Sequence, residues 1–173
     1  ILRREIWLPV MKASGVDISE ATNQIKKYIQ ERKFQGFMGL VQVFWAITPE
    51  DALYFSNPGD AGKMNSAFFF HWGDRDSNII SDWKELIDGE SRVLSIPEAH
   101  QLIGYYAIAD KSKDTLKICR SYQSYAIKAI VNRVSQQQWG DHNQRGGFVW
   151  CTTGGGKTMT SFKAGQLIID RGY

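Results

Sequence analysis

Apolar and polar positions in the first third of the chain follow two different patterns. Residues 18–33 (ISEATNQIKKYIQERK) carry apolar side chains at helical spacing, at Ala21, Ile25, Tyr28 and Ile29. Ser19 is a residue type that commonly caps helices, so we predict an amphipathic helix over residues 18–33 with Ser19 as its N-cap. Residues 39–48 (GLVQVFWAIT) are almost continuously apolar and short, which predicts a buried strand.

Short apolar runs and turn-forming residues alternate in the next part of the chain. Residues 52–60 (ALYFSNPGD) predict a second strand that ends in an Asn-Pro-Gly turn. Residues 67–74 (AFFFHWGD) form a third short run, which is aromatic and again ends at a turn. Residues 111–117 (KSKDTLK) are polar and charged, which favours a linker.

The last part of the chain predicts a helix, a strand, a glycine turn and a second helix. Residues 121–137 (SYQSYAIKAIVNRVSQQ) have one apolar stripe at helical spacing. A polar loop follows, and residues 148–153 (FVWCTT) then predict a short β run. The turn at residues 154–158 (GGGKT) leads into a predicted helix over residues 159–168.

A strand, a glycine turn, Lys-Thr and a helix stand in the order that a phosphate-binding loop requires. Glycines let backbone N–H groups close around phosphate oxygens, and the helix N-terminus adds its dipole. We therefore predict ATP binding, with Lys157 on the phosphates and the Thr158 hydroxyl on Mg²⁺, by Gly154, Gly155, Gly156, Lys157 and Thr158. Cys151 stands where the strict motif has glycine, and a glycine turn that binds nothing is the alternative.

Gln123, in the segment RSYQSYAIKAI (residues 120–130), is a candidate partner of this loop. Its amide can both donate and accept a hydrogen bond, as the reading of adenine requires. An Arg-x-Tyr-Gln segment upstream of a phosphate loop is typical of helicase-like motors. A glutamine near a helix start is otherwise an ordinary solvated side chain.

Composition and charge set limits on the class of protein. The chain has 173 residues, of which 43% are hydrophobic and 13% aromatic, so it has enough apolar side chains for a folded core. Its net charge of +3 is compatible with a nucleic-acid partner but is not evidence for one. Cys119 and Cys151 are too far apart for a metal-ligand or redox motif, and we expect a cytoplasmic protein that does not enter a membrane.

The segments NQIKKY, FFFHWGD, RSYQSYAIKAI and GGFVWCTTGGGKTMTSFKA resemble the restriction (motor) subunit of type I restriction-modification enzymes. The resemblance implies an α/β chain that contains the C-terminal part of a PD-(D/E)XK-type nuclease domain (residues 1–74). A mixed helical connecting region (residues 75–117) and the start of a RecA-like, SF2 helicase-type lobe (residues 118–173) would follow. We therefore expect a fragment that ends just inside the first motor lobe.

The resemblance also implies a function and its partners. Such subunits translocate DNA with ATP and cleave unmodified foreign DNA, so ATP and Mg²⁺ would be the cofactors. The partners would be double-stranded DNA and the specificity and methyltransferase subunits of the complex. Two other classes stay open: a stand-alone helicase-like DNA repair ATPase, and a non-catalytic interaction module with a structural remnant of the phosphate loop.

The nuclease residues are assigned only by this resemblance. Family nucleases place acidic residues and a Glu-x-Lys pair around Mg²⁺, followed by a helix with Gln-x-x-x-Tyr. Lys12, Gln24 and Tyr28 match the lysine, glutamine and tyrosine of that pattern. Val10 stands where the family has glutamate, and the earlier aspartate has no counterpart. Either the metal site has been lost or residues are missing near Val10 and near Leu167, and we favour the second explanation.

Basic residues provide candidate DNA contacts. Lys26 and Lys27 belong to a basic set on the exposed side of the first predicted helix, and a solvated face is the alternative. Relatives carry an Asp-Arg pair on the strand after the phosphate-loop helix, which Asp170 and Arg171 resemble.

Overall fold

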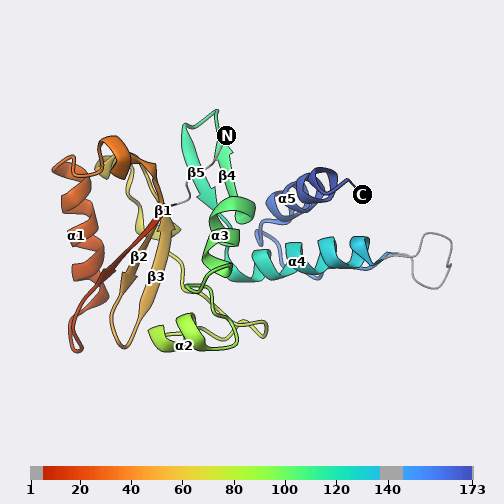
Figure 1. Ribbon diagram of the computed structural model, residues 1–173, viewed down its shortest axis with the longest axis horizontal. Coiled ribbons are helices and arrows are strands. Elements are labelled where there is room, and N and C mark those ends of the chain that lie inside the picture. Colours follow the sequence, from red (N-terminus) through yellow and green to blue (C-terminus); the bar gives the residue numbers. More distant parts are fainter. Residues whose placement is uncertain (1–5, 137–145, 173) are drawn as a thin grey trace. The chain divides into compact units, whose positions relative to one another are not determined.

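The computed structural model describes residues 6–136 and 146–172, and it is a mixed α/β structure, as the sequence predicted (Figure 1). The chain divides into two compact units, Ile1–Ile118 and Cys119–Tyr173. The helices and strands of the first unit are β1 (Ile6–Met11), α1 (Ile18–Gln30), β2 (Val41–Ile47), β3 (Ala52–Ser56), α2 (Trp83–Asp88), α3 (Glu98–Tyr106), β4 (Ala107–Asp110) and β5 (Thr115–Ile118). The second unit contains α4 (Ser121–Ser135) and α5 (Lys157–Asp170).

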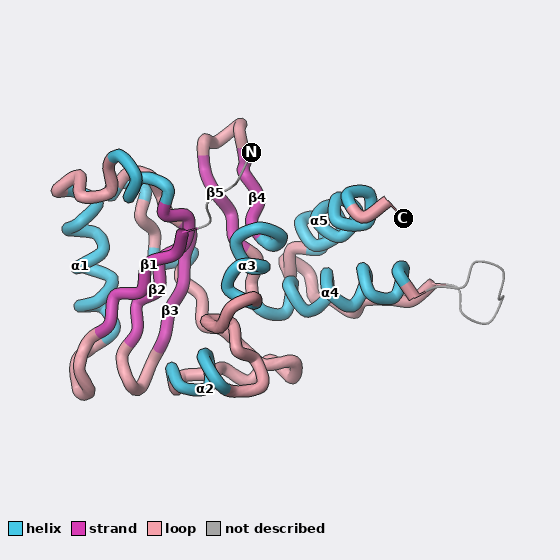
Figure 2. The backbone as a smooth tube through the Cα atoms, in the orientation of Figure 1, coloured by secondary structure: helices cyan, strands magenta, loops and turns pink. Residues whose placement is uncertain are grey.

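The three-stranded sheet of the first unit has the order β1-β2-β3 (Figure 2). β1 runs parallel to β2, with Pro9 opposite Trp45, and β2 runs antiparallel to β3, with Phe44 opposite Phe55. A central strand forms hydrogen bonds with a neighbour on each side, and proline has no N–H to donate. The position of Pro9 in a strand at the edge of this sheet is consistent with that lack.

Both faces of β2 are buried, which explains its continuous apolar sequence. On one face, Phe44 and Ala46 share a core cluster with Ala21 and Ile25 of α1. On the other face, Trp45 stacks on Tyr54 of β3, with ring centroids 4.9 Å apart. The central strand thus separates two apolar layers.

The ends of α1 differ from the prediction. The N-cap is Asp17, whose carboxylate accepts a hydrogen bond from the backbone N–H of Ser19 at 2.7 Å, so the prediction of Ser19 as N-cap was wrong. The helix ends at Gln30 because Arg32 takes a left-handed conformation with φ of 54°. The N–H groups of Arg32 and Lys33 then bond back to the carbonyls of Ile29 and Tyr28 at 3.1 and 3.0 Å.

The structure also defines the aromatic run and the predicted linker of the first unit. The run at residues 67–74 begins within a 3₁₀ turn (Ser66–Phe68), and Phe70 then makes an isolated bridge with Tyr54. Residues 111–117 are not a linker, because they form the turn of the β4–β5 hairpin and most of β5. The charges pair within that hairpin: Lys117 Nζ lies 2.7 Å from the Asp110 carboxylate, and this bond holds the pKa of Asp110 below its usual value.

In the second unit, α4 and α5 pack side by side (Figure 1). α4 ends at Ser135, and Gln137, where the sequence predicted its end, lies outside the described residues. The prediction of a strand over residues 148–153 was wrong: this segment is irregular, and Phe148 and Trp150 are 89% and 90% exposed. A strand needs a hydrogen-bonded neighbour, and the described residues of this unit contain no other strand.

Candidate nucleotide-binding site

The turn between residues 151 and 157 owes its conformation to its glycines. Gly154 and Gly156 have φ values of 79° and 73°, in the left-handed region that residues with a Cβ rarely occupy. Gly156 is also the N-cap of α5, which begins with Lys157. A Cβ on Gly156 would collide with the side-chain amide of Gln123, so a side chain here would be strained by its φ and would also displace that amide.

Two side chains from the first turn of α4 bind the carbonyls of this turn. Gln123 is 5% exposed, and its amide nitrogen donates to the Gly156 carbonyl at 3.5 Å. The oxygen of the same amide accepts the backbone N–H of Arg120 at 2.9 Å. The Tyr122 hydroxyl donates to the Gly155 carbonyl at 3.2 Å, a role that the sequence did not reveal because Tyr122 falls on the apolar stripe.

The donors that a phosphate group would need are bound within the loop. Lys157 Nζ donates to the Thr152 carbonyl at 3.1 Å, and the Gly155 N–H donates to the same carbonyl at 3.2 Å. An anion bound in the turn would therefore displace only the Thr152 carbonyl oxygen, which accepts both of these hydrogen bonds. Thr158, the second residue of α5, has an exposed side chain. These residues fit a phosphate group, because a lysine, backbone N–H groups and a hydroxyl converge on the N-terminus of a helix.

A buried lysine that the sequence did not reveal, Lys163, lies on α5. Lys163 is 6% exposed, and its ammonium group donates to the Gln166 side chain at 3.1 Å. Burial raises the pKa of the nearby Cys119 thiol to about 12, and the charge of Lys163 opposes that rise. Cys119 is consequently a neutral thiol at physiological pH, whereas Cys151 is half-buried beside the glycine turn.

Gln24 and Tyr28, two of the predicted nuclease residues, meet on α1. The Gln24 amide donates to the Tyr28 hydroxyl, and both side chains are half-buried. The Lys33 ammonium group lies 4.9 Å from the centre of the Tyr28 ring. The tyrosine is thus held at its hydroxyl and at its ring.

Lys12, the third predicted nuclease residue, follows the last residue of β1. Its backbone N–H donates to the Ile47 carbonyl at 2.9 Å, and the alternation of a strand places it on the same side as Val10. Val10 is part of the core cluster under α1. Within the described residues, no hydrogen bond joins Lys12 to Gln24 or Tyr28, and no group of three or more His, Cys, Asp or Glu side chains could hold a metal ion.

The predicted DNA-binding residues lie on exposed surface of their units. Lys26 and Lys27 are exposed on α1, and Lys27 lies 3.8 Å from Glu31. Asp170 is the last residue of α5 and Arg171 is its C-cap, with a backbone N–H that donates to the Leu167 carbonyl at 3.2 Å. Both residues thus complete the last turn of α5 and do not lie on a strand.

The second unit is similar to a family of restriction-enzyme subunits. A family model described as "Type III restriction enzyme, res subunit" matches residues 116–173, a range that contains the glycine turn, α4 and α5. Across residues 6–136 and 146–172, no helix is both long and apolar enough to cross a membrane.

Most of the chain is homologous to the endonuclease subunits of type I restriction enzymes, and the resemblance inferred from the sequence is confirmed. It is 30% identical to such a subunit of Staphylococcus saprophyticus over 161 residues, which cover 93% of this chain and 16% of the relative. It is 30% identical over 158 residues to one of Staphylococcus aureus strain COL, with 91% and 16% covered. An Escherichia coli relative is 28% identical over 129 residues, with 72% and 39% covered. The chain thus spans 16% of the length of the staphylococcal relatives.

Proposed function

We propose that this chain is part of the motor and nuclease subunit of a type I restriction-modification complex. In this role it would contribute to ATP-dependent translocation of double-stranded DNA and to the cleavage of unmodified foreign DNA. The observation that supports the proposal most directly is the glycine turn directly before Lys157. Gln123, near the start of α4, donates a hydrogen bond to this turn. The names of the relatives favour a restriction role over a stand-alone repair ATPase.

The nucleotide site would consist of residues Gly154, Gly155, Gly156, Lys157 and Thr158, together with Gln123. Lys157 would exchange the Thr152 carbonyl for phosphate oxygens, and the Thr158 hydroxyl would hold Mg²⁺. Each oxygen of an amide accepts two hydrogen bonds and each NH₂ donates two, so Gln123 keeps one of each for adenine. Bound ATP would supply the free energy of phosphate hydrolysis for movement along DNA.

The nuclease role would rest on the first unit. We propose that residues 1–74 are part of a PD-(D/E)XK-type domain, that residues 75–117 connect it to the motor, and that the motor lobe begins at residue 118. Lys12, Gln24 and Tyr28 would position DNA and the attacking water. Lys26, Lys27 and Arg171 would contact phosphates, because exposed cations attract the DNA backbone. Specificity and methylation would come from other subunits of the complex.

Nucleotide binding is the decisive test, because it separates a motor from an interaction module that keeps only the turn. Binding of fluorescent ATP in the presence of Mg²⁺ is compared for the chain, Lys157→Ala and Lys128→Ala, the last an exposed control on α4. A hydrogen bond to a charged group contributes about 1.5–3 kcal/mol, so Lys157→Ala should bind at least about tenfold more weakly. Equal binding by both variants, or no binding by the unchanged chain, would contradict the proposal.

A further inference from the structure

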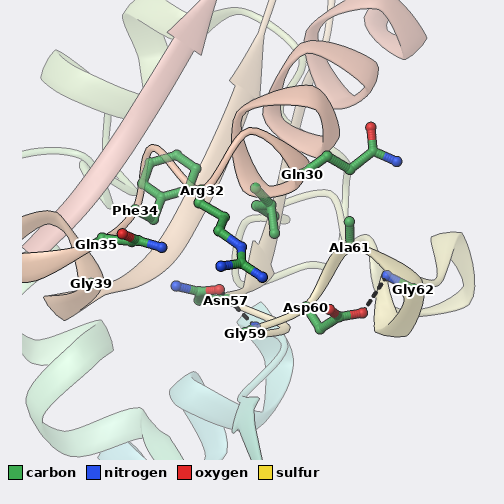
Figure 3. A pocket seen from close by; sticks show the side chains of 11 residues that line it. Gln30, Arg32, Phe34, Gln35, Gly39, Asn57, Gly59, Asp60, Ala61 and Gly62 are labelled. Atoms are coloured by element: carbon green, nitrogen blue, oxygen red, sulfur yellow. Dashed lines mark hydrogen bonds between the residues drawn. The ribbon is translucent and has the colours of Figure 1, made fainter.

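A polar pocket of about 680 Å³ lies at the C-terminal end of α1. Its walls come from the last turn of α1, the 3₁₀ turn Gly36–Leu40 and the loop of residues 57–62. Figure 3 shows the Arg32 guanidinium group reaching across the pocket toward that loop. None of the residues assigned to the nucleotide site or to the nuclease lines this pocket.

Arg32 occupies a backbone position that favours glycine. It is the first residue after the C-cap of α1, with a φ of 54°, and the two N–H groups that close the helix are its own and that of Lys33. Glycine is the usual residue at this place because a Cβ is strained in the left-handed region. A strained non-glycine residue is a reason to look for a role of its side chain.

The charge of Arg32 is not compensated locally, in contrast to its neighbours. Lys27 and Lys33 share the Glu31 carboxylate, at 3.8 and 2.9 Å. Among the described carboxylates, none lies within 4.0 Å of the Arg32 guanidinium group. The pocket therefore receives a cation whose charge the surrounding side chains leave unpaired.

Some of the other polar residues that line the pocket already form hydrogen bonds within its wall, and others are exposed. Asn57 accepts the Gly59 N–H at 2.8 Å and donates to the Val41 carbonyl at 2.7 Å, so it is occupied in holding the loop. The Asp60 carboxylate accepts the Gly62 N–H at 2.7 Å on the same wall. Gln30 and Gln35 also line the pocket, and both residues are exposed.

We propose that this pocket, centred on Arg32, binds a backbone phosphate of double-stranded DNA. The planar guanidinium group offers two parallel N–H donors that match two phosphate oxygens. The carbonyls at the end of α1, which would repel an anion, already accept the N–H groups of Glu31, Arg32 and Lys33. The inference rests on the proposed DNA-handling function. It adds a DNA contact at the opposite end of β2 from Lys12: Asn57 of the pocket wall bonds to Val41, the first residue of β2, whereas Lys12 bonds to Ile47, the last.

The Asp60 carboxylate opposes an anion, and this gives the test a second arm with the opposite sign. Asp60→Asn keeps an oxygen that can accept the Gly62 N–H but removes the negative charge from the wall. Arg32→Gly removes the guanidinium group and relieves the left-handed strain, so the fold should be at least as stable as before. Lys113→Met, in the exposed turn of the β4–β5 hairpin, is the control for a loss of one positive charge.

The experiment measures the binding of a short fluorescein-labelled DNA duplex to the chain by anisotropy, over a series of salt concentrations. Arg32→Gly should weaken binding about fivefold to tenfold and lower the salt slope by about one, as expected for the loss of one phosphate contact. Asp60→Asn should tighten binding, and thermal unfolding should show that Arg32→Gly is folded. Inorganic phosphate at the same phosphate concentration should not displace the duplex.

Three results would overturn the inference. Arg32→Gly could bind the duplex as Lys113→Met does, Asp60→Asn could weaken binding, or inorganic phosphate could compete as well as DNA, which would indicate a site for free phosphate. Each of these results leaves the proposed function intact if the unchanged chain binds DNA and ATP. Failure of the unchanged chain to bind any duplex would overturn the inference together with the DNA-handling part of the proposed function.

Discussion

The amide nitrogen of Gln123 lies 3.5 Å from the carbonyl oxygen of Gly156, across the contact between the start of α4 and the turn before α5. At this distance the hydrogen bond is long and contributes little by itself. The close approach is possible only because Gly156 has no side chain. The two parts of the predicted ATP site, Gln123 and the turn before Lys157, are therefore in direct contact.

Replacement of Gln123 by alanine tests whether this amide also reads the base. If the amide contacts adenine, Gln123→Ala should weaken the binding of ATP more than the binding of GTP. The difference should be about 1–3 kcal/mol, as for amide readout of adenine in DNA. Competition of both nucleotides against a fluorescent analogue measures the difference, with the exposed Gln136→Ala as control. Equal weakening of ATP and GTP would limit Gln123 to holding the turn.

Gly156→Ala and Gly165→Ala should have opposite effects on stability. At Gly156 an alanine would be strained at φ of 73° and would collide with Gln123, so the free energy of unfolding should fall by about 1–3 kcal/mol. Gly165 lies inside α5, and a Cβ added there would meet no atom within 4 Å, so alanine should raise stability by about 0.5–1 kcal/mol. Urea unfolding of both variants checks the prediction, and a destabilised Gly165→Ala would contradict it.

Asp17 should make the stability of α1 depend on pH. Hydrogen bonds from the side chain and the N–H of Ser19 hold the pKa of Asp17 below its usual value. The stabilisation is therefore present above the ordinary aspartate pKa and is lost as the pH falls through the lower, folded value. Asp17→Ala should lower the unfolding temperature at neutral pH, whereas Asp17→Asn, which keeps a capping oxygen, should change it less. An equal loss in both variants would show that capping is not the cause.

The two cysteines should differ in their reactivity. The buried Cys119 thiol, with a pKa raised to about 12, has almost no thiolate at pH 8, whereas Cys151 is partly accessible. Iodoacetamide should modify Cys151 in the folded chain and should modify both residues in urea, as peptide mapping can show. Because the unfolded thiol ionises at a lower pH than the folded one, this group should also reduce stability as the pH rises from about 9 toward 12. Rapid modification of Cys119 in the folded chain would contradict its burial.

Tyr28→Phe tests the proposed nuclease role in the assembled enzyme. This variant keeps the ring beneath Lys33 and removes only the hydroxyl group that Gln24 contacts. DNA cleavage should fall about tenfold or more if the hydroxyl positions the reacting groups, while DNA-stimulated ATP hydrolysis should be unchanged. Tyr105→Phe, at an exposed tyrosine of α3, is the matched control. Loss of both activities would indicate a folding defect, and retention of both would remove Tyr28 from the nuclease proposal.

The sequence by itself was sufficient for features that depend on local periodicity. The helical spacing around Ala21 and Ile25 predicted α1, and the continuous apolar run predicted β2 as a buried strand. The three glycines before Lys157 predicted a turn, and two of them have positive φ values. These features follow from interactions between residues that are close in the chain.

Only the tertiary structure decided the features that depend on a distant partner. Residues 148–153 have the composition of a strand but form none, because a strand exists only where another strand pairs with it. Residues 111–117 have the composition of a linker, yet they belong to a hairpin in which Lys117 pairs with Asp110. The sequence singled out Gln123 as a candidate partner of the loop, but its hydrogen bond to Gly156 and the uncompensated charge of Arg32 depend on which backbone and side-chain groups the fold brings within bonding distance.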